Sequence, residues 1–146
     1  MLLTAASALV ASLMFALSQP AVLNVDGQRI ISDVPPVTQM KEAFVPVRAV
    51  AEGLGAQTSY DAKTGIVELV RGSDVFRIQI GSRIARLNGS KMTISSAPFT
   101  VRGRTMIGVR ALARAFGTAY HYDVSRATID VTTPGVIEAG AQEFSE

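Results

Sequence analysis

The chain repeats itself at a fixed spacing, and this repeat constrains its fold more than any other feature of the sequence. When the 146 residues are shifted by 62 positions (89 − 27 = 62), identical residues meet along most of the chain: Gly27 with Gly89, Pro36 with Pro98, Val47-Arg48-Ala49 with Val109-Arg110-Ala111, Gly55 with Gly117, and Tyr60-Asp61 with Tyr122-Asp123. Self-similarity of this kind predicts two copies of one supersecondary unit, which bury their apolar faces together.

Each copy opens with an expected hairpin and continues into one helix. Asp26-Gly27 and Asn88-Gly89 are the dipeptides of a tight hairpin turn, because both central residues need a positive φ. Apolar residues then recur at i, i+3, i+4 and i+7, which predicts one amphipathic helix over 47–54 and another over 109–116. Pro46 fits the first helical position. Gly55 and Gly117 fit the left-handed residue that ends each helix.

A second expected hairpin closes each copy, over 58–70 and 119–131, and alternating residues at 75–80 predict a joining strand. The predicted fold class is α+β: two tandem repeats, each a small curled antiparallel β-sheet packed on one short α-helix. A unit of about sixty residues buries little surface. We therefore expect the two copies to pack together or to share the joining strand.

The predicted organisation has a targeting segment and a tail around the repeats. It comprises a signal peptide (1–18), repeat 1 (19–72), a linker strand (73–83), repeat 2 (84–133) and a flexible acidic tail (134–146). The apolar stretch before Ser18 carries no charge and falls short of the roughly 20 residues of a membrane span. We expect a secreted, periplasmic or envelope-associated protein with no membrane span after signal removal. Because a basic start is missing, an upstream start or a buried Ala-rich helix is an alternative.

The helix region and the tight turns resemble a known family. The stretch Phe44-Val45-Pro46-Val47-Arg48 and its continuation to Ala56, followed by Tyr60-Asp61, is similar to the copper amine oxidase N-terminal domain-like family, also called the stalk domain. The second copy has lost the proline and keeps the Arg and Gly. The resemblance implies an exported accessory domain with a curled antiparallel sheet around a helix. It does not imply an oxidase, because the family's copper ligands lie in a separate catalytic domain.

Metal and enzyme chemistry find little support in the residue types. The chain has no cysteine, its one histidine is His121 on an expected exposed strand, and its five methionines are scattered. We therefore expect no metal, no cofactor and no enzymatic activity. Asp61 and Asp123 each begin an expected turn, where an Asp side chain accepts backbone N–H bonds. The alternative function is a small secreted cell-wall hydrolase or its accessory subunit.

Arg48 and Arg110 stand in the first turn of each expected helix, where a positive charge opposes the helix dipole. A compensating partner is therefore expected for each arginine. Carboxylates or loop carbonyls could fill this role, and we hypothesise Asp61 and Asp123 as the partners.

Positive charge is concentrated in the middle of the chain. Nine Lys and Arg residues lie between 71 and 114, against the single acid Asp74 (9 − 1 = +8), whereas the whole chain carries only +2. The predicted binding face consists of Arg77, Arg83, Arg86, Arg102 and Arg104. Such a face would attract an anionic cell-envelope polymer. A surface protein is the other expected partner, specific nucleic-acid binding is not expected, and open sheet edges could support a homodimer. The alternative is a solvated face without a ligand.

Overall fold

The computed structural model describes residues 19–39 and 42–133. The predicted signal peptide (1–18) and acidic tail (134–146) lie outside the described residues. The described chain is a mixed α+β structure with two short helices and mostly antiparallel, curled sheets, which agrees with the predicted α+β class.

Strands and helices follow the order expected from the sequence. The first part contains β1 (Gln19–Pro20), β2 (Val22–Val25), β3 (Gln28–Ile30), β4 (Val37–Gln39), β5 (Glu42–Pro46), α2 (Val47–Gly53), β6 (Gln57–Asp61) and β7 (Ile66–Arg71). After β8 (Asp74–Gln79) come β9 (Ile84–Leu87), β10 (Ser90–Thr93), β11 (Phe99–Val101), β12 (Arg104–Gly108), α3 (Val109–Phe116), β13 (Ala119–Asp123) and β14 (Thr128–Thr132). The start of β9 lies 62 residues after that of β2 (84 − 22), and the start of α3 lies 62 after that of α2 (109 − 47).

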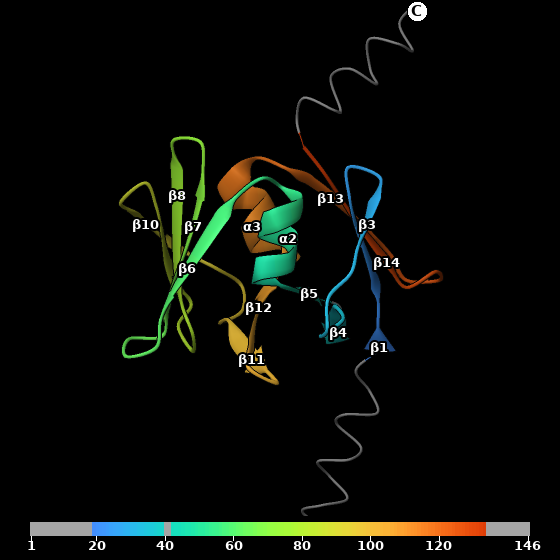
Figure 1. The fold of residues 1–146 in the computed structure, drawn as a ribbon, viewed down its shortest axis with the longest axis horizontal. Coiled ribbons are helices and arrows are strands. Elements are labelled where there is room, and N and C mark those ends of the chain that lie inside the picture. Colours follow the sequence, from blue (N-terminus) through green and yellow to red (C-terminus); the bar gives the residue numbers. More distant parts are fainter. Residues whose placement is uncertain (1–18, 40–41, 134–146) are drawn as a thin grey trace, which may run out of the picture.

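Three sheets surround the two helices (Figure 1), and each sheet takes strands from both sequence halves. The orders are β1-β4-β5-β12-β11, β10-β9-β8-β7-β6 and β13-β14-β2-β3. We expected each half to carry a sheet of its own, and this arrangement corrects that expectation. Because one half has too few residues to bury a core alone, pairing its hairpins with those of the other half buries more apolar surface.

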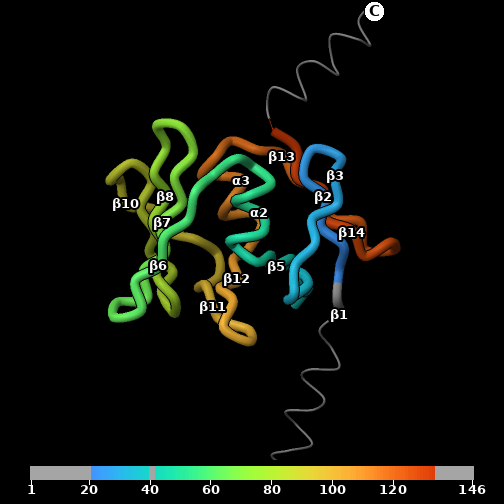
Figure 2. The backbone as a smooth tube through the Cα atoms, in the orientation of Figure 1, coloured from blue at the N-terminus to red at the C-terminus, as the bar shows by residue number. Residues whose placement is uncertain are grey.

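The central sheet joins the halves directly. Strand β5 pairs antiparallel with β12 in the register Val45 to Ile107, two residues that are themselves 62 apart (107 − 45). Val45 and Ile107 are fully buried beneath the two helices. Both helices pack on this strand pair, and Figure 2 shows them between the sheet of β6 to β10 and the sheet of β13, β14, β2 and β3.

The core is continuous across both halves. Phe76 of β8 is fully buried and meets Phe116 of α3 edge-to-face, with ring centroids 6.1 Å apart. Leu23 of β2 and Ile129 of β14 belong to the same cluster. Burying side chains of this size stabilises the fold by roughly 1.5–3 kcal/mol each. Because they share one cluster, β2 and β14 are held together through the same core.

Turns and helix ends follow local backbone requirements. Asp26 and Gly27 have φ of 50° and 80°, and Asn88 and Gly89 have 52° and 83°, which are the values of the expected hairpin turn. Gly55 and Gly117 are left-handed after the helices, with φ of 73° and 65°. Each therefore has the conformation that the helix-end prediction assigns to it.

Pro46 was predicted to be the first residue of the helix, but it immediately precedes the helix. It is the last residue of β5 and precedes the first helical residue, with φ −64° and ψ 123°, instead of occupying the first helical position. The extended ψ continues the strand, while the fixed φ of proline is compatible with both states. Gly108 holds the same place in the other half with φ −62° and ψ 133°, so this backbone does not require proline.

Candidate functional site

Two of the predicted basic residues lie together on the outer face of the β6–β10 sheet. Arg77 of β8 is the cross-strand partner of Arg86 on β9, and Arg86 is the partner of Lys91 on β10. Directly opposed residues share a sheet face, so the three cations form one row across three adjacent strands. We call Arg77, Arg86 and Lys91 the basic row. All three side chains are exposed.

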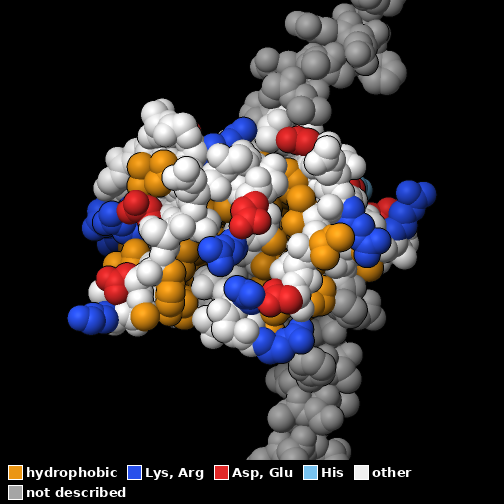
Figure 3. All heavy atoms as spheres, viewed as in Figure 1, with side chains coloured by type: hydrophobic (Ala, Val, Ile, Leu, Met, Phe, Trp, Pro, Cys, Tyr) orange, Lys and Arg blue, Asp and Glu red, His pale blue; other side chains and the backbone are white. Residues whose placement is uncertain are grey.

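The neighbours of the basic row hold two of its members in place. Arg77 donates through Nη2 to Glu68 Oε2 at 2.6 Å and through Nε to the same oxygen at 3.2 Å. Arg86 Nη1 donates to the carbonyl of Gly89 at 3.1 Å. Figure 3 shows blue side chains gathered at the margin of the molecule beside β10. The row, with its single neighbouring acid Glu68, retains a positive excess.

The other predicted basic residues do not join this row. Arg83 precedes β9 and donates from Nε to the carbonyl of Ile94 at 3.1 Å. Arg102 stands in the turn between β11 and β12, with φ 49°, in the central sheet. Arg104 lies on β12 of that sheet. The single basic face predicted from the sequence is therefore divided between two sheets.

Arg104 is already neutralised by an acid. Its Nε donates to both carboxylate oxygens of Asp33 at 3.1 and 3.0 Å, and its Nη2 donates to Oδ2 at 2.9 Å. These hydrogen bonds from Arg104 lower the pKa of Asp33, and the same bonds raise the pKa of Arg104. Arg104 and Asp33 neutralise each other in this forked pair. Arg104 is therefore not a free cation for a ligand.

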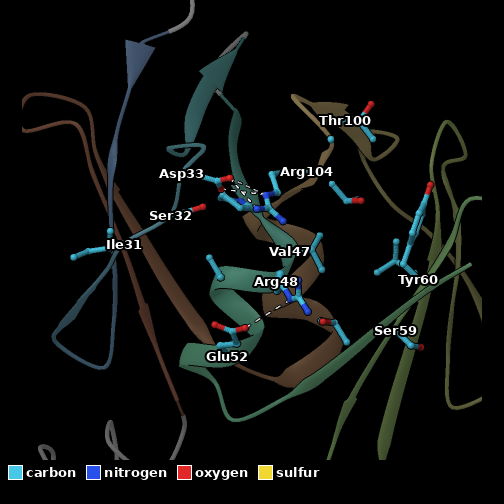
Figure 4. A pocket seen from close by; sticks show the side chains of 16 residues that line it. Ile31, Ser32, Asp33, Val47, Arg48, Glu52, Ser59, Tyr60, Thr100 and Arg104 are labelled. Atoms are coloured by element: carbon cyan, nitrogen blue, oxygen red, sulfur yellow. Dashed lines mark hydrogen bonds and ion pairs between the residues drawn. The ribbon is translucent and has the colours of Figure 1, made fainter. Parts of the chain in front are cut away.

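A groove lies beside α2. It has a volume of about 480 Å³, within the range of ligand sites. Its walls are the segment 31–33 after β3, the junction of β5 and α2 at 46–49, the middle of β6 at 58–60, and the β11–β12 hairpin. We call it the α2 groove. Figure 4 shows Arg48 between Tyr60 on one wall and Asp33 with Arg104 on another.

Arg48 has a partner in the α2 groove other than the hypothesised one. Its Nε lies 3.8 Å from Glu52 Oε1, one helical turn away, and the two side chains are 70% and 72% exposed. Asp61, the hypothesised partner, instead accepts the backbone N–H of Lys63 at 2.9 Å. An exposed pair at this distance contributes little to binding or stability, so the guanidinium of Arg48 remains available to a ligand.

Arg110 holds the matching place at the start of α3 and is tied differently. Its Nε donates to Tyr120 Oη at 3.2 Å, and this hydrogen bond raises the pKa of Arg110. The hypothesised partner Asp123 accepts bonds from Ser125 Oγ at 2.7 Å and from the backbone N–H of Arg126 at 3.1 Å. The serine bond is the main cause that lowers the pKa of Asp123. Asp61 and Asp123 thus each stabilise the turn in which they lie and do not pair with the arginines.

Sequence reasoning missed several residues of these sites. Lys91 was counted among the cations but not placed beside Arg77 and Arg86, although strand alternation around the Asn88-Gly89 turn carries that information. Ile31 and Tyr60 lie on the rims of the α2 groove, and the sequence gave no sign of this groove, because the segments that form it are far apart in the chain.

Within the described residues, no group of three or more His, Cys, Asp or Glu side chains could hold a metal ion. His121 is exposed on β13, opposite Asp130. Within residues 19–39 and 42–133, no helix is both long and apolar enough to cross a membrane.

The comparisons with known proteins agree with the resemblance seen in the sequence. The family model described as the copper amine oxidase N-terminal domain matches residues 24–131. No curated protein matches the chain.

Proposed function

Because the chain belongs to the copper amine oxidase N-terminal domain family, we propose that it is an exported, non-catalytic binding module that attaches to anionic polymer of the cell envelope. Export is supported by the uncharged apolar stretch before Ser18. The absence of catalysis is supported by the use of Asp61 and Asp123 in turns and of Asp33 in an ion pair. In each of these three cases the carboxylate serves the fold.

The module consists, in this proposal, of two tandem copies covering 19–72 and 84–133 and joined by 73–83. Support comes from the spacing of 62 residues shared by side-chain identities and by element starts. The copies exchange hairpins, so that each outer sheet combines the opening hairpin of one copy with the closing hairpin of the other. The folding unit is therefore the pair rather than the single copy.

One observation carries the proposed ligand: the three cations of the basic row occupy adjacent strands on a solvent-exposed sheet face. Neighbouring strands lie about 4.8 Å apart, so the row offers regularly spaced charges that a polyanion can follow. Arginine pairs with phosphate or carboxylate through two donors at once. A phosphate- or carboxylate-bearing polymer is the ligand class that this arrangement fits.

The test is retention on immobilised polyphosphate and on polygalacturonate, measured as a function of salt. We expect binding to fall as salt rises, because exposed charges are screened within about 10 Å at 0.1 M salt. The triple variant Arg77→Gln, Arg86→Gln, Lys91→Gln is expected to lose retention.

The matched control removes the same charge elsewhere, through Arg29→Gln, Arg102→Gln and Arg126→Gln. All three of these arginines are exposed and lie off the basic row. Equal loss in both triple variants would show that only net charge matters and would contradict a defined binding face. Polyphosphate and polygalacturonate distinguish a phosphate ligand from a carboxylate ligand.

A further inference from the structure

We propose that the α2 groove binds an extended peptide that adds to the free edge of β6 as a further strand and places an acidic side chain against Arg48. This site is separate from the basic row, which occupies the sheet face and not its edge. The ligand class is also different, since a polyanion follows charge whereas this site reads a polypeptide backbone.

The β6 edge is open and unprotected. β6 ends its sheet, with β7 as the one strand paired to it in that sheet. Natural edge strands are blocked by lysine, proline or shortness. The opposite edge β10 carries Lys91, and β3 is three residues long with Arg29 at its centre. The five residues of β6 include no Lys, Arg or Pro, so its outward N–H and C=O groups can receive another strand.

The edge opens into the groove because a small residue stands where the other half has a large one. Thr58 of β6 corresponds to Tyr120 of β13 (120 − 58 = 62). The hydroxyl of Tyr120 accepts a hydrogen bond from Arg110. Thr58 is too short to do the same for Arg48, whose partner is the distant Glu52. The space and the cation are both left to a ligand.

Apolar side chains on the rims give the peptide something to bury. Ile31 is 89% exposed and Tyr60 is 59% exposed, both in water and both lining the groove. In Figure 4, Ile31 and Tyr60 come from opposite walls, with Arg48 between them. Large apolar residues held in solvent around a concave site are typical of an interaction surface. A peptide side chain beside Tyr60 would remove that area from water.

Charge decides which kind of ligand fits. The ionic residues of the groove are Arg48, Arg104, Asp33 and Glu52, two of each sign. Arg104 and Asp33 saturate one another, so the groove lacks the positive excess that a polyanion needs. A nearly neutral peptide with one carboxylate matches Arg48 without opposing the other groups.

The register of such a strand follows from side-chain alternation. Thr58 and Tyr60 share the inner face of β6, since their partners Leu69 and Val67 are both buried. Peptide side chains two apart would therefore lie opposite them. We expect an acidic residue opposite Thr58, because Arg110 reaches the corresponding Tyr120 in the other half, and an apolar residue opposite Tyr60.

The experiment screens the protein against a library of blocked hexapeptides. We expect the selected peptides to carry Asp or Glu two positions from an aliphatic or aromatic residue, with no proline between them, because a strand needs each backbone N–H on the paired side. A selected peptide should shift the amide resonances of 57–61, and its Kd should rise about tenfold in Arg48→Ala. The matched variant Arg110→Ala should bind the peptide with the same Kd as the unchanged protein. Replacing the peptide's Asp by Asn, or its Glu by Gln, should not change the Kd measured with Arg48→Ala, because the partner of the carboxylate is already missing.

Four results would overturn the proposal. The first is a library without enrichment, and the second is selection of proline-containing peptides, which would show binding without strand addition. The third is displacement of the peptide by chitohexaose, which would assign the groove to a neutral sugar. The fourth is self-association abolished by Tyr60→Ala, which would assign the edge to a second copy. Polyphosphate retention is unaffected by all four, so failure here is distinguishable from failure of the basic row.

Discussion

The two outer sheets are built from matching hairpins and differ by one strand. In the sheet β13-β14-β2-β3, the strands β14 and β2 pair directly and in parallel. In the sheet β10-β9-β8-β7-β6, the matching strands β7 and β9 are separated by β8, which pairs antiparallel with both. Only the segment 72–83 joins β7 to β9, which run in the same direction, so this segment must return along the sheet and fills the gap as β8.

This inserted strand changes the outer face. Across the β6–β10 sheet the row runs Ser59, Glu68, Arg77, Arg86, Lys91. Across the other sheet it runs His121, Asp130, Asn24, Arg29. The first row carries +2 and the second is neutral with His uncharged. Asp130 accepts a hydrogen bond from Asn24 at 2.9 Å, where Glu68 pairs with Arg77. A connecting segment can therefore add a cation, here Arg77, to a sheet face as well as join two hairpins.

The largest expected effect comes from removing the core anchor of the inserted strand. Phe76→Ala should lower the free energy of unfolding by about 3–5 kcal/mol, because the ring is fully buried against Phe116. Urea denaturation measures this. Ile84→Ala, at an exposed site on the outer face of the same sheet, is the control and should change it by less than about 1 kcal/mol. A small effect of Phe76→Ala would mean that β8 is not part of the core.

The second effect concerns the rows themselves. Arg86→Asn gives the β6–β10 sheet the residue found at the matching position, Asn24 (86 − 24 = 62). The slope of log affinity for polyphosphate against log salt should fall by about 1, because one contact to the polymer is lost. Affinity measurements at several salt concentrations test this. Arg29→Asn, in the neutral row, should leave the slope unchanged, and an equal change in both would remove the distinction between the sheets.

The third expected effect concerns the residues that follow the two helices, which differ between the halves. Thr118 follows Gly117 and is buried, with no hydrogen-bond partner for Oγ1 among the described residues, whereas the matching residue is Ala56. Thr118→Val keeps the shape and removes the unsatisfied hydroxyl. It should raise the free energy of unfolding by about 1 kcal/mol. Thermal denaturation of both proteins decides the sign, and a lower melting temperature would reveal a partner for the hydroxyl.

The smallest effect is a pH dependence. Arg104 and Asp33 form an ion pair between the two halves. Glu42, which stands at the position matching Arg104, accepts hydrogen bonds from the hydroxyls of Ser95 and Ser96 at 2.8 and 2.5 Å. Arg104 lowers the pKa of Asp33 below its ordinary 3.8. A lowered folded-state pKa stabilises the protein above pH 3.8, and this stabilisation is lost as the pH falls through the folded pKa.

Asp33→Asn should therefore be slightly less stable than the unchanged protein at pH 6. The difference should disappear below the folded pKa. Denaturation curves recorded at several pH values from 6 downward measure both quantities. A difference that does not shrink as the pH falls below 3.8 would mean that the pair acts through packing rather than charge.

Local features of the fold could be predicted from the sequence, whereas strand order could not. The Asp26-Gly27 and Asn88-Gly89 turns, the helices and the joining strand follow from backbone preference and periodicity. The parallel pairing of β2 with β14 joins residues about a hundred positions apart, and no local pattern encodes it. The prediction that Pro46 is the first helical residue was wrong by one position, because the φ of proline fits a strand end and a helix start equally well.

The candidate sites divide in the same way. Arg77 and Arg86 were identified from charge, but charge alone also selected Arg104, whose partner Asp33 lies 71 residues away. The α2 groove depends on Thr58 where the other half has Tyr120. That difference is visible in the sequence, but its meaning requires knowing that Tyr120 bonds to Arg110 and that Thr58 and Arg48 line one groove.

We propose that the sheet with the inserted strand provides the surface for anionic polymer. The most direct measurement is a map of backbone amide shifts as short-chain polyphosphate is added to the isotopically labelled protein. Shifts should be concentrated in 74–79, 84–87 and 90–93, with little change in the sheet formed by β13, β14, β2 and β3. Shifts centred on that second sheet, or spread evenly over both, would contradict it.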